Sequence, residues 1–153
     1  MNGTGPTLLF VYGTLRRAVQ APAYSLFSDQ ADFFDHGSIT ARMYDFGNYP
    51  GVILSSDPAD RVLGELFVLR TAETTLQLLD QYEGIHGGTK PWPEQYARVQ
   101  QPVLSDSHGT VTAWVYRYLL SVEGKPRIAH GDYVQHLRGR KNYRPPPIDD
   151  GAA

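Results

Sequence analysis

Glu83 is the residue whose type and position most clearly suggest chemistry. It ends a segment, residues 71–83, whose apolar residues recur at the spacing of an amphipathic helix. At about 100° per residue, Glu83 falls about 20° from Ala72, between Leu76 and Leu79 on the apolar face. Burial and the negative end of the helix dipole would both raise the pKa of this carboxyl group, which suits general acid–base catalysis near neutral pH. The alternative is that the helix frays at Tyr82 and that Glu83 faces water.

A second candidate site is the turn Tyr12-Gly13-Thr14-Leu15. It follows an apolar, β-favouring run, residues 7–12, that we expect to form a buried strand. The backbone N–H groups of such a turn have no partner in a sheet and can hold a carboxylate, and Gly13 would let a ligand approach the main chain closely. A Gly-Thr pair is also typical of an ordinary turn, so both interpretations remain open here.

Other motifs do not meet the requirements of the sites that they resemble. The run Gly3-Thr4-Gly5 precedes the first strand, whereas a phosphate-binding loop follows one, and residues 87–90 lead into Pro91 rather than into a helix. The five histidines lack metal-binding spacing, so we expect no metal. The absence of cysteine excludes thiol nucleophiles and disulfides, and no GxSxG elbow is present.

The elements that would position these residues are mostly strands. The segment before the helix, residues 61–70, is the clearest later strand, and Gly84 is a good stop signal for the helix. We expect extended segments at residues 7–12, 33–34, 38–44, 51–54, 61–70, 96–104 and 110–119, a helix at 71–83, and short helical or irregular segments at 16–28 and 130–137. This order favours one α+β domain, residues 1–143, around a mainly antiparallel sheet or small barrel, with a flexible Pro-rich tail at residues 144–153.

Composition narrows the class of protein. The 153 residues are 41% hydrophobic and 20% charged with a net charge of −2, which predicts one globular domain and argues against nucleic acid as the principal partner. The longest apolar stretch, residues 8–11, is far too short to cross a bilayer, and no export pattern begins the chain, so we expect no membrane association. The lack of cysteine is compatible with a reducing cytosol, and we expect a cytoplasmic protein.

Five segments, in order along the chain, resemble the signatures of the gamma-glutamylcyclotransferase-like family, especially its gamma-glutamylamine cyclotransferase branch. Each signature alone is unspecific, but their order over roughly residues 8–118 is hard to obtain by chance. The segments are residues 9–15, 49–53, 62–67, 79–84, and 96–99 together with 114–116.

The resemblance implies a small β-barrel with flanking helices. It also implies a cavity in which residues 12–15 contact the α-amino acid end of a substrate while Glu83 moves protons. Glu65 is the competing carboxylate, because it alternates with Leu63, Phe67 and Leu69 on a strand face that could look into the barrel. We keep Glu65 as the second choice.

The reaction that the resemblance implies is a cyclisation of a small γ-glutamyl substrate. The α-amine attacks the γ-carbonyl group, 5-oxoproline forms, and an amine or amino acid leaves, without a metal or cofactor. One alternative is a non-catalytic binding or regulatory module that retains the cavity. Another is the removal of a γ-glutamyl protecting group from a biosynthetic intermediate. Neither the amine nor the oligomeric state can be predicted from the sequence.

Overall fold

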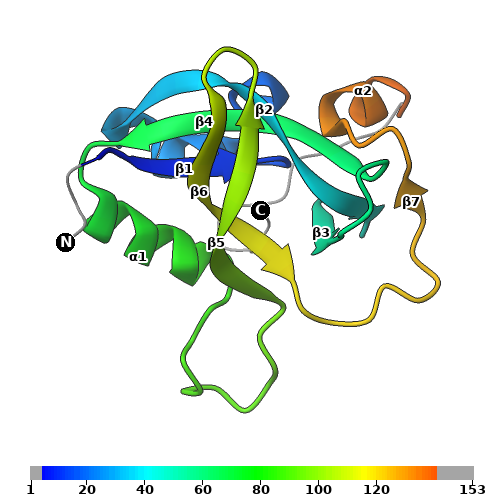
Figure 1. Ribbon diagram of the computed structural model, residues 1–153. Helices are drawn as coiled ribbons and strands as arrows, with labels where there is room; N and C mark the ends of the chain where they lie inside the picture. The colour runs from blue at the N-terminus through cyan, green and yellow to red at the C-terminus, as the bar shows by residue number, and fades with distance from the viewer. Residues whose placement is uncertain (1–4, 141–153) are drawn as a thin grey trace.

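Five strands close into a barrel at the centre of the computed structural model, which describes residues 5–140. Around the barrel the order is β2 (Ala31–Asp45), β4 (Arg61–Leu69), β1 (Thr7–Val11), β6 (Gly109–Tyr118) and β5 (Tyr96–Ser105), and β5 pairs again with β2 (Figure 1). Only β1 and β6 run parallel among these pairs. The expected mainly antiparallel barrel with flanking helices is confirmed, whereas the tail expected at residues 144–153 lies outside the described residues.

Strand β2 is longer than the sequence indicated. The expected pieces at residues 33–34 and 38–44 belong to one strand of 15 residues, with a register shift between Phe33 and Asp35 where it pairs with β4. A bulge of this kind lets the ladder continue past an irregular residue while bending the strand. The second half of β2 also pairs with β3 (Pro50–Leu54) and β7 (Arg127–Ile128), so one strand joins the barrel to a smaller sheet.

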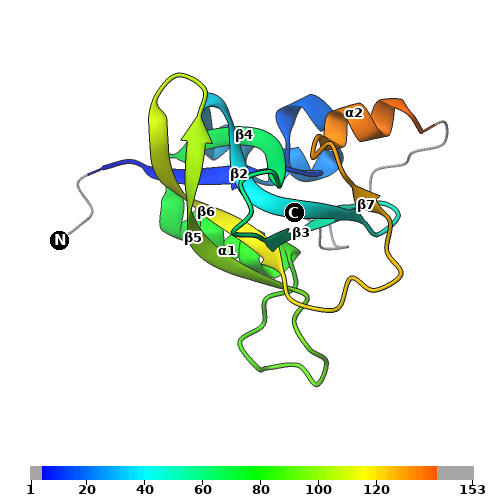
Figure 2. The ribbon, with the colours of Figure 1, turned by 45° about the vertical axis from the view of Figure 1, so that its right-hand side comes forward.

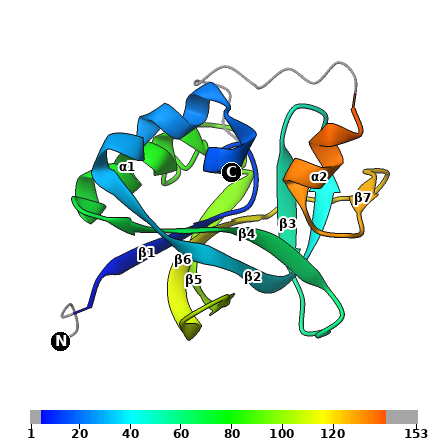
Figure 3. The ribbon, with the colours of Figure 1, turned by 90° about the horizontal axis from the view of Figure 1, so that it is seen from above.

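Two α-helices lie at opposite ends of the molecule. Helix α1 (Ala72–Tyr82) connects β4 to β5, and α2 (Tyr133–Arg138) lies near β3 and β7 (Figures 1 and 3). The expected stop after α1 is confirmed, because Gly84 has a φ of 78°, which glycine adopts at little cost. The loop between α1 and β5 extends away from the barrel (Figure 2). Among the described residues no helix is long and apolar enough to cross a membrane.

Three short 3-10 segments follow β1 and cover the outer side of the barrel. They are η1 (Arg17–Val19), η2 (Pro22–Leu26) and η3 (Ser28–Gln30), where the sequence indicated a loop with a short helix. Phe27, between η2 and η3, packs edge-on against Phe67 of β4 with ring centroids 5.3 Å apart. These segments therefore bury the β4 face that carries Phe67, opposite the face that looks into the barrel.

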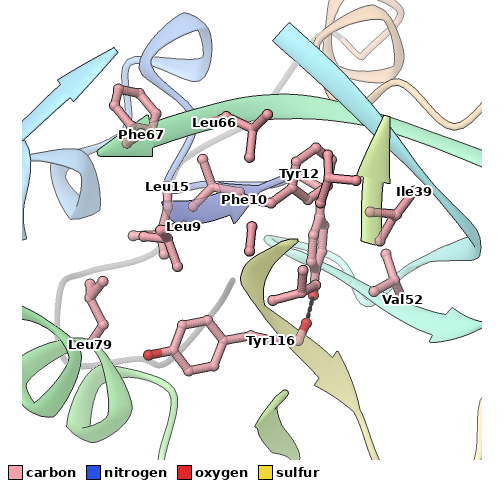
Figure 4. Packing of buried hydrophobic residues seen from close by; sticks show 14 of the residues in the cluster. Leu9, Phe10, Tyr12, Leu15, Ile39, Val52, Leu66, Phe67, Leu79 and Tyr116 are labelled. Carbon is pink, nitrogen blue, oxygen red and sulfur yellow. Dashed lines mark hydrogen bonds between the residues drawn. The ribbon is translucent and has the colours of Figure 1, made fainter. Parts of the chain in front are cut away.

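The core fills the barrel and the space between the barrel and α1. Figure 4 shows Phe10, Leu66, Ile39 and Val52 gathered inside the barrel, with Leu79 approaching from α1. Strands β1 and β4 approach very closely at Gly64, where a Cβ atom would lie 2.3 Å from the carbonyl oxygen of Val11. Only glycine fits there, so glycine at this position allows β4 to approach the last residue of β1, immediately before residues 12–15.

Candidate active site

Glu83 lies directly after α1, and its side chain points into the protein. Its N–H donates to the carbonyl oxygen of Leu79 at 2.9 Å, so the helical path continues through this residue. The residue is 2% exposed, and neither carboxylate oxygen has a hydrogen-bond partner within the described part of the chain. The predicted inward orientation is therefore confirmed, and the alternative of a frayed, solvated Glu83 is wrong.

The surroundings of Glu83 disfavour its charged form. Burial raises the pKa of the Glu83 carboxyl group well above its usual value, and the nearby negative charge of Asp80 raises it further. A buried carboxyl group without hydrogen bonds has no evident structural role, and such groups concentrate at functional sites. The helix thus positions a carboxyl group that holds its proton to a higher pH than an exposed glutamate does.

Three buried tyrosines from different parts of the chain lie near enough to this carboxyl group to interact with its charge. Tyr12 follows β1, Tyr96 begins β5 and Tyr116 lies on β6, and all three are about 1% exposed or less. Burial is the main cause that raises the pKa of each phenol, and the charge of Glu83 contributes in each case. Glu83 and the turn that begins at Tyr12 therefore meet at one place in the structure.

The hydroxyl protons of these tyrosines are already engaged. The Tyr12 hydroxyl donates to the carbonyl oxygen of Tyr116 at 2.6 Å (Figure 4), and the Tyr96 hydroxyl donates to that of Pro50 at 2.9 Å. The Tyr116 hydroxyl donates to Asp80 at 2.6 Å. Because each proton is used, the phenol oxygens are left as acceptors, which suits a neighbouring N–H or protonated carboxyl group.

The turn of residues 12–15 is tightly closed. The N–H of Arg16 donates to the carbonyl oxygen of Gly13 at 3.0 Å. Within residues 5–140, the N–H groups of Gly13 and Leu15 donate no main-chain hydrogen bond, which leaves them available to an anion. The structure places Tyr12 of this turn near Glu83, as the family resemblance implied, but the role of these residues in binding substrate stays a prediction.

This group of residues is covered in the structure. Residues 12–15 and Glu83 are all buried, and none of the four pockets that we characterise among the described residues is lined by them. One pocket of about 420 Å³ lies beside the loop after Glu83 and is lined by residues such as Gly84, Ile85 and Trp92.

The competing carboxylate, Glu65, has a different environment. It is 1% exposed, and its oxygens accept from the N–H groups of Arg17 at 2.7 Å and Ala18 at 3.2 Å and from Nε of Arg16 at 3.3 Å. It therefore anchors η1 against the outer side of β4, on the same face as Phe67. The expectation that this face looks into the barrel is wrong, because the 3-10 segments bury it from outside. The geometry favours Glu83 over Glu65 as a proton carrier.

The sequence did not indicate which residues lie near Glu83. Tyr96, Tyr116 and Asp80 come from three elements, and the sequence pattern indicated only that tyrosines of the later strands belong to a sheet. The alternation of Trp114, Tyr116 and Tyr118 along β6 is a signal that these residues share a face, but nothing local shows that this face meets α1.

One group of possible metal ligands occurs among the described residues, and its Asp35 carboxylate accepts hydrogen bonds from the protein. Asp35, His36 and Asp106 place one ligand atom each within 4.8 Å of one another. Hydrogen bonds from Ser105 and from the N–H of Ser107 hold the pKa of Asp35 at about 2. These bonds join Asp35 of β2 to the turn between β5 and β6.

Replacement of Glu83 by Gln should change how stability depends on pH. An unfolded glutamate ionises near pH 4.3, whereas burial makes Glu83 hold its proton to a higher pH. Above the unfolded pKa the native state therefore binds more protons than the unfolded state, and the stability of the wild type falls as pH rises through that window. Gln does not titrate, so the variant should match the wild type below about pH 4 and exceed it increasingly toward neutral pH. Thermal melts from pH 4 to pH 8 measure this, and a constant difference would contradict it.

Comparisons with known proteins agree with this fold. A family model described as gamma-glutamyl cyclotransferase, AIG2-like, matches residues 9–135, which is most of the chain. No curated protein matches.

Several solved structures are similar. An AIG2-like protein from Mus musculus is 22% identical, with 91% of this chain and 97% of that chain covered and a TM-score of 0.65. YkqA from Bacillus subtilis is 23% identical with a TM-score of 0.66, and the match covers 90% of this chain but 44% of YkqA. PH0828 from Pyrococcus horikoshii is 21% identical, with 88% and 99% covered and a TM-score of 0.60. At these identities the likeness establishes the fold.

Proposed function

Because the chain belongs to the AIG2-like gamma-glutamyl cyclotransferase family, we propose that it converts a γ-glutamyl compound into 5-oxoproline and a free amine. The substrate class is a γ-glutamylamine or a γ-glutamyl dipeptide, the former in keeping with the branch that the signatures resemble most. Glu83 is the general acid and base, and residues 12–15 hold the α-amino acid end of the substrate.

The observation that carries this proposal is the buried carboxyl group of Glu83 near the turn after β1, which has no hydrogen-bond partner in the part of the chain that the structure describes. A residue kept for structure would have its oxygens paired, as those of Glu65 are. Burying the Glu83 carboxyl group without hydrogen bonds lowers the stability of the fold. We infer that a substrate nitrogen supplies the missing hydrogen-bond partner during turnover.

The reaction needs little more than a bent substrate and one proton carrier. The α-ammonium group must lose a proton before its nitrogen attacks the γ-carbonyl carbon, and a five-membered lactam then closes. The bond from the γ-carbon to the leaving nitrogen breaks, and that nitrogen must gain a proton. One carboxyl group can do both, as base in the first step and as acid in the second.

Residues 12–15 would supply the bend. An α-carboxylate held on the free N–H groups of Gly13 and Leu15 would place the α-amine toward Glu83, because Tyr12 begins the same turn and lies beside that carboxyl group. Fixing the two reacting groups of one molecule in this way contributes up to about 7–11 kcal/mol in the most favourable cases. The acceptor oxygens of the surrounding phenols would stabilise the α-ammonium group before it is deprotonated.

A product assay tests the proposal. The purified protein, incubated with a panel of γ-glutamylamines and γ-glutamyl dipeptides, should release 5-oxoproline together with one equivalent of the free amine, measured by mass spectrometry. The same lactam would form if the protein removed a γ-glutamyl protecting group from a biosynthetic intermediate. The identity of the released amine would distinguish that reaction. Thermal stabilisation by a γ-glutamyl compound without any product would overturn the enzymatic proposal and favour a non-catalytic binding module.

A further inference from the structure

We propose that Asp80 is a positioning residue for the reaction above, and that Asp80 and Arg98 together control the protonation of Glu83. The expected effects on kinetics rest on the proposed function. The contacts of Asp80 with Arg98 and Tyr116 do not depend on turnover.

The geometry begins on α1, where Asp80 and Glu83 are three residues apart. Residues at this spacing are neighbours on one side of a helix, roughly 5–6 Å apart at Cβ. The carboxylate of Asp80 is held on both oxygens: Oδ1 accepts from the Tyr116 hydroxyl at 2.6 Å and from Nε of Arg98 at 2.8 Å, and Oδ2 accepts from the second guanidinium nitrogen at 3.0 Å. This bidentate pair is the most directional form of ion pair.

The two residues that contact Asp80 come from neighbouring strands of the barrel. Arg98 of β5 and Tyr116 of β6 are directly opposite each other in the ladder. The guanidinium group of Arg98 also lies 4.3 Å from the ring centroid of Trp114, which fixes it from the other side. The last turn of α1 is thus fastened to the barrel at Asp80, and the buried residues Tyr82 and Glu83 follow directly after that attachment.

The charges of Asp80 and Arg98 also affect the ionisation of Glu83. Among residues 5–140, the titratable groups that interact electrostatically with Glu83 are Asp80 on its own helix and the phenols of Tyr12 after β1, Tyr96 of β5 and Tyr116 of β6. Of these, Asp80 carries a formal charge, and its sign opposes ionisation of Glu83. Arg98 compensates that charge, and the Asp80 and Arg98 side chains are only 21% and 22% exposed, so solvent screens the pair incompletely.

Removal of either partner should therefore displace the titration of Glu83 in opposite directions. Asp80→Asn removes the opposing charge, so the acid limb of the kcat/KM profile should move to lower pH by about one pH unit. Arg98→Gln leaves Asp80 uncompensated, so the same limb should move to higher pH. Arg98→Lys retains the cation and should leave the limb near its wild-type position. A merely structural role would lower activity in all three variants without opposite displacements.

A matched control is available on the surface. Arg70 and Asp32 form an ion pair at 3.3 Å whose side chains are 53% and 64% exposed. Asp32→Asn and Arg70→Gln make the same changes in net charge, and neither should displace the profile.

A spectroscopic titration separates this inference from the proposed function. In protein labelled with ¹³C at the glutamate side-chain carboxyl carbon, the Glu83 resonance is identified by its disappearance in Glu83→Gln. Its titration midpoint should fall in Asp80→Asn and rise in Arg98→Gln, whether or not any substrate is turned over. Midpoints that do not move, or that move together, would overturn the inference. A wild type that shows these displacements but forms no 5-oxoproline would instead overturn the proposed function alone.

Discussion

Glu83→Gln should lower the turnover of γ-glutamyl substrates by about 10²–10⁴-fold while the protein remains folded. The substitution retains the shape of the side chain and removes the proton that the mechanism needs to move twice. Because the position is buried and neither oxygen has a partner among the described residues, the amide breaks no hydrogen bond of the native structure. Steady-state release of 5-oxoproline measures the effect, and circular dichroism confirms that the fold survives.

Glu73→Gln is the matched control for this prediction. Glu73 lies in the first turn of the same helix and is exposed, so its replacement should leave turnover within about twofold. Unchanged turnover in Glu83→Gln would dismiss the catalytic role of Glu83. If Glu65→Gln alone abolished activity in a stable protein, the two carboxylates would have to exchange roles.

Glu65→Ala should lower the free energy of unfolding by about 3–5 kcal/mol. The substitution leaves Arg16, which is 6% exposed, without its partner on β4, and it removes the acceptor for the N–H groups of Arg17 and Ala18. Arg16 also contacts Asp132 at 3.1 Å, and Asp132 caps α2, so the damage should extend toward that helix.

Urea denaturation measures this loss. Asp32→Ala, which breaks the exposed pair with Arg70, serves as the control and should cost no more than about 1 kcal/mol. If Glu65→Ala were as mild as this control, the buried contacts of Glu65 would not stabilise the fold, and the distinction between the two carboxylates would lose its physical basis.

What could be predicted from the sequence depended on local periodicity. The orientation of Glu83 follows from the spacing of apolar residues along α1, and the end of the helix follows from Gly84. The turn after β1 could be found in the same way, because a buried apolar run ends at Gly13. The barrel required the order of the strands and the resemblance to a known family.

What could not be predicted depended on contacts between distant segments. The inner and outer faces of β4 could not be distinguished, because the 3-10 segments that cover Glu65 and Phe67 have no strong helical pattern. The continuity of β2 was hidden by an irregularity that only its pairing with β4 resolves. The contacts of Asp80 with Arg98 and Tyr116 join residues 18 and 36 positions apart, for which the sequence carries no local signal.

The central claim is that Glu83 exchanges protons with the nitrogen of a substrate held by the turn after β1. A crystal structure of the protein with bound 5-oxoproline tests this most directly, by the distance from the Glu83 carboxyl group to the ring nitrogen. We expect roughly 2.6–3.2 Å, with the product carboxylate on the N–H groups of residues 12–15. A lactam bound at those residues with its nitrogen facing any group other than Glu83, or bound elsewhere in the protein, would contradict the account.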